Sequence, residues 1–211
     1  ILFRGTKADL GLVERIRTRG FPTLEYFWKD AIGLGERAQM RGSGNGYQKL
    51  RDSSRVRKNG DGIPGVDASY LRGRGEITAS TFTRIYTDPR TLAPFAQQRI
   101  HDRRSPELFV GPLVVVHEAP PVLTGRIGVS VSDQDVVFNQ SFYGYSPYGF
   151  PEASTLVRYL ALILGSELAT WITLVTSGRF GVEREAIEKA TLDRMPVPDF
   201  RTLSPLRKPK P

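Results

Sequence analysis

The chain has 211 residues, which suits one domain or a tight pair of domains and is enough to bury a hydrophobic core. It has no cysteine and only two histidines, which excludes a disulfide framework, a thiolate zinc site and a cysteine nucleophile, and nearly excludes a multi-histidine metal site. Thirty lysines and arginines against 22 acidic residues give a net charge of +8, which favours a polyanionic partner, either nucleic acid or a membrane. Because the chain begins at Ile1, we expect it to be part of a longer protein.

Two helices are predicted near the N-terminus. Thr6 and Asp9 have the spacing of a capping box, and apolar residues follow at helical spacing, so we predict an amphipathic helix at residues 7–18. Residues 23–30 are predicted as a second short helix whose apolar side chains face the core. We expect residues 33–41 to form an isolated strand, and the alternating residues 78–87 to form another.

The second half of the chain is more regular. Residues 113–117 are predicted as a buried strand, and two further segments, 126–132 and 136–142, as a β-hairpin or meander with one buried face. One long helix is predicted over 151–175, with residues 182–192 as the next helix. The long helix has a predicted buried stripe of Leu156, Leu160, Ile163, Leu164, Leu168, Trp171 and Val175.

These elements predict an α+β fold class. We expect a small, curved, mostly antiparallel sheet with basic loops, flanked by helices on its C-terminal side. The apolar stretch at 156–175 includes Arg158 and Glu167, which favours a core helix over a membrane span. Residues 201–211 are predicted to be a basic, proline-rich tail beyond the fold.

The positive charge is concentrated in the middle of the chain. Residues 41–104 carry a net charge of +7, whereas residues 105–200 carry −5. The same middle segment is rich in glycine, and glycine lets a backbone approach a polyanion closely. We therefore predict that residues 41–104 contact nucleic acid; the alternative is a solvated loop region that is only incidentally basic.

Arginine is the expected base reader within this segment, because its guanidinium can bond both O6 and N7 of guanine. The sequence does not rank the candidates for base and phosphate contacts. They are Arg51, Arg55, Arg57, Lys58, Arg72, Arg74, Arg84, Arg103 and Arg104. Tyr143 and Tyr145 belong to a second, aromatic cluster that could stack on bases, and a role in the core is an equal alternative for them.

No catalytic constellation is found in the sequence. A phosphate-binding P-loop, a nucleophile elbow and the Asn/Asp-Pro-Pro-aromatic tetrapeptide of amino-methyltransferases are all absent. Asp61, Asp67 and Asp88 are scattered rather than clustered as a divalent-metal nuclease requires. We expect no catalytic residue, metal site or cofactor in this chain, and we expect His117, at a strand end, to be structural.

Four segments carry a resemblance to a known family. Residues 109–118 (FVGPLVVVHE) contain a Phe-x-Gly-Pro sequence before a strand, and residues 135–144 (DVVFNQSFYG) follow. Residues 156–168 (LVRYLALILGSEL) and 194–198 (RMPVP) come next. In this order they resemble the C-terminal target recognition (specificity) domain of TaqI-like and type IIG N6-adenine DNA methyltransferases of restriction–modification systems, which are related to type I specificity subunits. Gly165 stands where the family has asparagine. The resemblance covers residues 105–200 well, 1–40 weakly and the basic segment not at all.

The resemblance implies a domain over residues 1–200 that recognises a specific sequence in double-stranded DNA. Its DNA-facing part would be about 41–104, and its strand and helix scaffold about 105–200. The implied partner is an N-terminal methyltransferase domain or companion subunit, which would bind S-adenosylmethionine, with or without a nuclease, in a bacterial cytoplasm. Two alternatives are a non-specific nucleic-acid-binding domain and a structural or protein-interaction domain whose C-terminal helices dock a partner.

Overall fold

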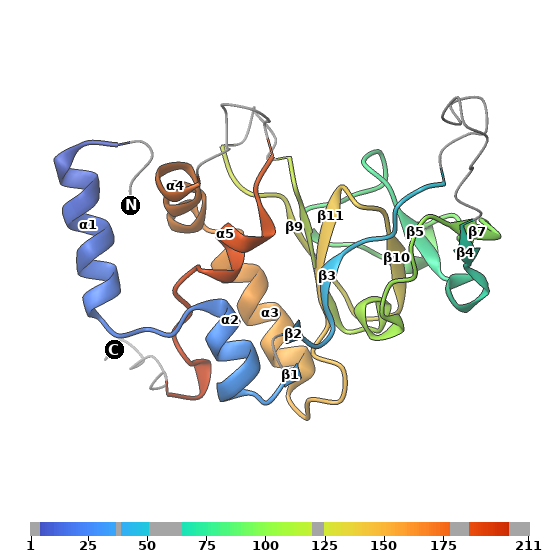
Figure 1. The fold of residues 1–211 in the computed structure, drawn as a ribbon, viewed down its shortest axis with the longest axis horizontal. Coiled ribbons are helices and arrows are strands. Elements are labelled where there is room, and N and C mark those ends of the chain that lie inside the picture. The colour runs from blue at the N-terminus through green and yellow to red at the C-terminus, as the bar shows by residue number, and fades with distance from the viewer. Residues whose placement is uncertain (1–4, 37–38, 51–64, 120–124, 178–185, 203–211) are drawn as a thin grey trace, which may run out of the picture.

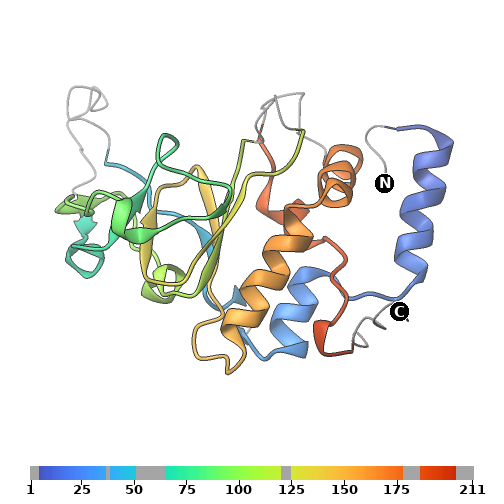
Figure 2. The same cartoon turned by 180° about the vertical axis from the view of Figure 1, so that it is seen from behind.

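The computed structural model describes residues 5–36, 39–50, 65–119, 125–177 and 186–202 of the chain. In this part of the chain the fold is mixed α and β. The helices gather at one end of the molecule and short strands occupy the other end, with the largest sheet between them (Figure 1). The view from behind shows the same division (Figure 2).

The first predicted helix is confirmed as α1, Lys7–Thr18. The side chain of Thr6 accepts a hydrogen bond from the backbone NH of Asp9, and the Asp9 carboxylate accepts one from the backbone NH of Thr6 at 2.7 Å, which completes the capping box. Asp9 also accepts a hydrogen bond from the Trp171 indole at 3.2 Å. Only Val13 of α1 is buried, so this helix packs against the rest of the molecule along a narrow stripe.

The second predicted helix is confirmed too, although it changes type along its length. α2, Leu24–Tyr26, continues without a break into a π-helical turn at Phe27–Ala31. Leu24, Phe27 and Trp28 are fully buried, as their spacing predicts.

The largest sheet has five strands in the spatial order β3-β11-β8-β9-β6. Its neighbours are antiparallel except that β6 runs parallel to β9. The strands are β3 (Ser43–Asn45), β6 (Ile85–Tyr86), β8 (Leu113–His117), β9 (Val129–Ser132) and β11 (Phe142–Tyr145). The prediction of a buried strand at 113–117 is therefore confirmed.

Both faces of this sheet are covered, which explains why its central strands are almost entirely buried. Successive side chains of a strand point to opposite faces. Accordingly, Val114 and Val116 of β8 belong to a core shared with the helices, and Leu113 and Val115 belong to a second core on the opposite face. We call these the helical core and the β-lobe core.

The β-lobe, which is residues 65–112 apart from β6, together with β10, covers the second face. It contains a parallel pair, β5 with β10, and an antiparallel pair, β4 with β7. Short 3₁₀ turns connect these strands. The strands are β4 (Val66–Asp67), β5 (Gly75–Ile77), β7 (Arg99–Ile100) and β10 (Val136–Phe138).

The hairpin predicted from segments 126–132 and 136–142 is wrong. β9 pairs with β8, whereas β10 leaves the sheet and pairs with β5 of the β-lobe. The alternation in β9 does not mark a solvent face, because Ser130 and Ser132 are buried. Their small hydroxyls find partners: Ser130 Oγ lies 2.8 Å from Thr87 Oγ1, and Ser132 donates to a backbone carbonyl.

The strand predicted at 78–87 is mostly wrong as well. Only β6, Ile85–Tyr86, is extended and paired; residues 78–82 form a turn in which Thr81 and Phe82 both donate backbone hydrogen bonds to the Thr78 carbonyl. The hydroxyls of Thr78 and Thr81 form hydrogen bonds within this turn, and such local hydrogen bonds compete with the pairing of strands. The single strand expected at 33–41 is instead an antiparallel pair, β1 (Gly35–Glu36) with β2 (Gln39–Met40).

The long helix predicted at 151–175 is two helices, α3 (Ala153–Leu164) and α4 (Glu167–Thr176). Ser166 accepts a hydrogen bond from the backbone NH of Ala169 and so caps a new helix after Gly165. The break turns Leu168, predicted as buried, half into solvent at 50% exposure. No single described helix has the length and apolar composition to cross a bilayer. α3 and α4 together have that length and composition, but the pair is bent by 61°.

The C-terminal helix is shorter than predicted. α5 spans Lys189–Asp193, while residues 186–188 are not helical and the remainder of the 182–192 prediction lies outside the described residues. A 3₁₀ turn at Phe200–Thr202 follows α5. The predicted tail is likewise described only at residues 201 and 202.

Candidate nucleic-acid interface

The β-lobe brings together arginines that lie far apart in the sequence. They come from the turn that leads into β5, from β7 and from the segment after β7. Three of them lie near Tyr70 and two lie near Asp67. We call the five the arginine cluster: Arg72, Arg74, Arg99, Arg103 and Arg104. Arg51, Arg55, Arg57 and Lys58, also predicted as contacts, lie outside the described residues.

Tyr70 organises one side of the cluster. Its hydroxyl donates to the Arg104 carbonyl at 3.0 Å and accepts from the Arg104 backbone NH at 3.1 Å. The Arg103 guanidinium lies 5.4 Å from the centre of the Tyr70 ring, which is cation–π distance. Burial raises the pKa of Tyr70, while the charges of Arg103, Arg104 and Arg74 act in the opposite direction. Sequence reasoning missed Tyr70, because a lone tyrosine in a 3₁₀ turn has no periodic pattern.

The members of the cluster are held to different degrees. Arg104 donates from Nε to the Gly46 carbonyl at 3.1 Å, and Arg99 donates from Nη2 to the Gly65 carbonyl at 2.6 Å. Bonds to neutral carbonyls fix these side chains without cancelling their charge. Arg72 and Arg103 are exposed, and neither forms an ion pair with a described carboxylate. Arg99 was not among the sequence candidates.

Two carboxylates accompany the cluster. Asp67 accepts hydrogen bonds from the Ser69 side chain and backbone, and these, with smaller effects from Arg72 and Arg99, lower its pKa. Asp135 lies 3.3 Å from Arg74 Nη2. The cluster therefore keeps a positive excess, as a surface that contacts phosphates requires.

Arg84 is a predicted contact that no observed interaction joins to the cluster. It belongs to the segment before β6 and donates from Nη2 to the Ile127 carbonyl at 3.3 Å. This bond attaches Arg84 to the segment that leads into β9.

The stacking role expected for Tyr143 and Tyr145 is wrong, and the core alternative is correct. Both rings are buried in the helical core, where no base can reach them. Tyr143 donates to the Ile187 carbonyl at 2.7 Å, and Tyr145 donates to Asp193 Oδ1 at 3.0 Å. Burial raises the pKa of Tyr143 to about 12.

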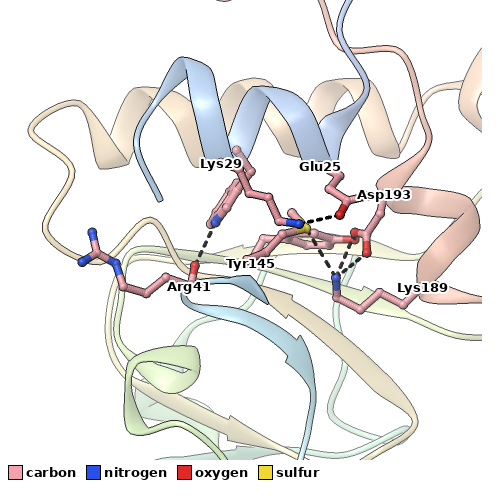
Figure 3. A network of polar contacts seen from close by, with 8 residues as sticks. Glu25, Lys29, Arg41, Tyr145, Lys189 and Asp193 are labelled. Carbon is pink, nitrogen blue, oxygen red and sulfur yellow. Dashed lines mark hydrogen bonds and ion pairs between the residues drawn. The ribbon is translucent and has the colours of Figure 1, made fainter. Parts of the chain in front are cut away.

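Tyr145 belongs to a polar network that joins α2, β11 and α5 (Figure 3). Lys189 lies 2.7 Å from Asp193 and 5.1 Å from the centre of the Tyr145 ring, which packs edge-on against Trp28. The Trp28 indole donates to the Arg41 carbonyl at 2.8 Å. The donors joined by dashed lines in Figure 3 all have acceptors within the fold, so this network stabilises the helical end.

The helical end has an apolar groove beside α1, which we call the α1 groove. Its volume is about 750 Å³. Leu12, Phe21, Leu162 and Leu168 contribute exposed apolar surface to it, and Arg15 and Arg19 also line it.

No group of three or more His, Cys, Asp or Glu side chains in the described ranges could hold a metal ion.

His117 is structural, as predicted. At the end of β8 its ring stacks on Phe82 at 5.7 Å and tilts against Phe142 at 4.8 Å. Burial lowers its pKa below the ordinary value of 6.5.

This lowered pKa predicts a pH dependence of stability. As pH falls below 6.5 the unfolded chain takes up a proton before the folded chain does, so the free energy of unfolding should decrease. In the variant His117→Phe, which keeps an aromatic ring, the free energy of unfolding should depend less steeply on pH. The slope should be smaller by up to about the uptake of one proton on unfolding. Urea unfolding at several pH values between 7.5 and 5 would measure it. An unchanged dependence in the variant would show that other groups cause the acid sensitivity.

Comparison of the sequence with models of protein families finds no match, and comparison with curated proteins finds none.

Proposed function

We propose that this chain is a double-stranded DNA recognition domain. The arginine cluster carries the proposal, because three segments of the β-lobe contribute its five arginines, and Arg74, Arg103 and Arg104 lie close enough to Tyr70 to affect its pKa. Arg72, Arg99 and Arg103 are exposed, and none of these three forms an ion pair with a described carboxylate. Arginine suits this task because its planar fork binds both phosphate oxygens and the edge of guanine.

The finer part of the proposal rests on the resemblance of residues 105–200 to specificity domains. On that basis the domain directs an attached adenine methyltransferase, in the cytoplasm of a bacterium, to a short target sequence. S-adenosylmethionine would bind to the attached catalytic domain or companion subunit. The chain described here would supply the DNA contacts.

Fluorescence anisotropy with labelled nucleic acids tests the proposed function. The chain should bind a 20-base-pair DNA duplex at 50 mM salt more tightly than single strands of the same sequence. Enrichment from a pool of randomised duplexes should return one defined site. Equal binding to duplex and single strands, or a pool without enrichment, would favour the non-specific alternative. No binding to any duplex at 50 mM salt would overturn the proposal.

A prediction about catalysis follows from the absent motifs. The chain alone should neither transfer a methyl group to DNA nor nick a plasmid, because its sequence has no catalytic tetrapeptide or carboxylate cluster. Labelled methyl transfer from S-adenosylmethionine, and a nicking assay with magnesium, would measure both activities. Turnover that follows the protein through repurification would contradict the prediction.

The α1 groove favours a protein-interaction domain as the second candidate function. Its apolar surface and its two arginines suit an amphipathic helix with acidic residues along one edge. Leu162→Asp would place a charge at an apolar side chain that is 75% exposed and lines the groove. If this function is correct, the substitution should abolish binding of a synthetic acidic amphipathic helix, measured by calorimetry, without lowering the melting temperature.

A further inference from the structure

A polar pocket of about 500 Å³ lies beside the arginine cluster. The parallel pairing of β5 with β10 creates it, because Gly75 is the register partner of Val136 and the residues before each strand therefore meet. The pocket is lined by Gly73, Arg74, Gly75, Pro89, Arg90, Gln134 and Asp135.

Arg74 is held in this pocket by its backbone and by its side chain. Its carbonyl accepts a hydrogen bond from Phe95 NH at 2.7 Å, and its own NH donates to the Leu71 carbonyl. The preceding Gly73 has a φ of +80°, which favours glycine and makes the turn possible. Arg74 Nη2 lies 3.3 Å from Asp135 Oδ2, and the side chain is 23% exposed. Its guanidinium is therefore more fixed than those of Arg72 and Arg103.

One end of the Arg74 guanidinium lacks an acceptor. Nη1 is buried and has no hydrogen-bond partner among the described residues. A buried donor without an acceptor is unfavourable, so a small rotation that presents Nη1 to an acceptor in the pocket would gain a hydrogen bond. Nη2 can still donate a second hydrogen bond alongside its contact with Asp135.

The charge of the pocket selects among possible ligands. Asp135 offsets the charge of Arg74. The other cation of the pocket, Arg90, is paired with Asp88, so the pocket has little net charge with which to attract a phosphate group. A neutral pair of acceptors does not need such a net charge. In the major groove, guanine offers two adjacent acceptors, O6 and N7. Adenine offers one acceptor and one donor there, so it would match the guanidinium at a single position.

We propose that Arg74, oriented by Asp135, reads one guanine from the major groove, while the exposed Arg72 and Arg103 contact phosphates. This inference rests on the proposed function and assigns one base contact within it. Such a contact contributes discrimination at a single base pair and changes salt dependence little, because no phosphate is neutralised by it.

The test uses the duplex enriched from the randomised pool, with 7-deazaguanine, which lacks N7, replacing one guanine at a time. At one position the wild-type chain should lose affinity, by less than the roughly 5- to 150-fold of a whole bidentate base contact, because the modified base keeps O6. Arg74→Met, which is similar in length but has no donors, loses both hydrogen bonds, so it should bind the unmodified duplex about 5- to 150-fold more weakly and lose nothing further at that position. Arg90→Met is the matched control, because Arg90 lines the same pocket but is 82% exposed and is paired with Asp88; it should keep the wild-type pattern.

The other outcomes distinguish an error in the Arg74 assignment from an error in the proposed function. An Arg74→Met variant that keeps the full 7-deazaguanine penalty, or a wild-type chain that loses no affinity at any guanine of the enriched site, overturns the Arg74 assignment and leaves the proposed function intact. Failure to bind duplex DNA, or binding without an enriched site, overturns the proposed function itself. If Arg74→Met does not fold, Asp135→Asn serves instead: it should reduce the penalty at the same guanine, and an unchanged penalty would count against the assignment.

Discussion

Replacing Leu160 by alanine should lower the free energy of unfolding by about 2–5 kcal/mol. Leu160 is fully buried in the helical core, where α3 packs on β8 and β9. Truncation would remove buried apolar atoms and leave a cavity, because the closely packed neighbouring side chains cannot move far enough to fill it. Urea unfolding monitored by circular dichroism would measure the loss.

Leu162→Ala is the matched control for this prediction. Leu162 lies on the same helix but is 75% exposed, so its truncation should change the free energy of unfolding by less than about 0.5 kcal/mol. The fraction of Leu160→Ala that remains folded should bind DNA with wild-type affinity, because the helical core lies on the other face of the sheet from the β-lobe. Lost affinity with unchanged stability would place α3 at the DNA instead.

Replacing Arg72 and Arg103 together by alanine should make DNA binding less sensitive to salt. Each phosphate contact contributes about −0.9 to the slope of log K against log salt concentration, so the variant's slope should be shallower by up to about two units. Between 50 and 200 mM salt, its affinity should then fall about 12-fold less than that of the wild type. Both side chains are exposed, so the melting temperature should hardly change.

Arg15→Ala combined with Arg19→Ala removes the same charge from α1 and its C-terminal cap residue; α1 lies at the opposite end of the molecule from β4 and β7 (Figures 1 and 2). This control should leave the salt slope nearly unchanged. Equal effects of the two pairs would indicate that net charge, rather than the arginine cluster, determines the affinity.

The elements that the sequence predicts well have a strong local signal. The capping box at Thr6 and Asp9 specifies the start of α1, and the β-branched run at 113–117 reads as a buried strand whatever its partners are. The break at Gly165 also has a local signal, the capping Ser166, but the continuous apolar stripe outweighs it. Weighing caps more heavily than periodicity would have separated α3 from α4.

Strand pairing was not predictable, because it depends on long-range packing. The residues of β9 and β10 alternate like a hairpin, yet β10 pairs with β5, some 60 residues earlier in the chain. With both sheet faces covered, the alternation in β9 separates its two valines, which belong to the helical core, from the buried hydroxyls of Ser130 and Ser132, rather than a core from solvent. The burial of Tyr143 and Tyr145 was not predictable for the same reason. The sequence pattern of an aromatic cluster on a strand is the same whether the rings are buried in a core or exposed on a binding surface.

The charge map indicated the segment that contains the arginine cluster, but not its members. Arg72, Arg74, Arg103 and Arg104 were candidates, whereas Tyr70 and Arg99 gain their positions only from the pairing of β4 with β7. The difference between exposed Arg103 and restrained Arg74 also depends on tertiary contacts, namely Tyr70 for the first and Asp135 for the second.

Amide chemical shifts recorded while the isotopically labelled chain is titrated with a 20-base-pair duplex test most directly whether the arginine cluster is the DNA surface. We expect the largest changes in residues 70–75 and 99–104, which include all five arginines of the cluster, and small changes in α1, α3 and α4. Changes confined to those helices, with residues 70–75 and 99–104 unaffected at saturating duplex, would contradict it.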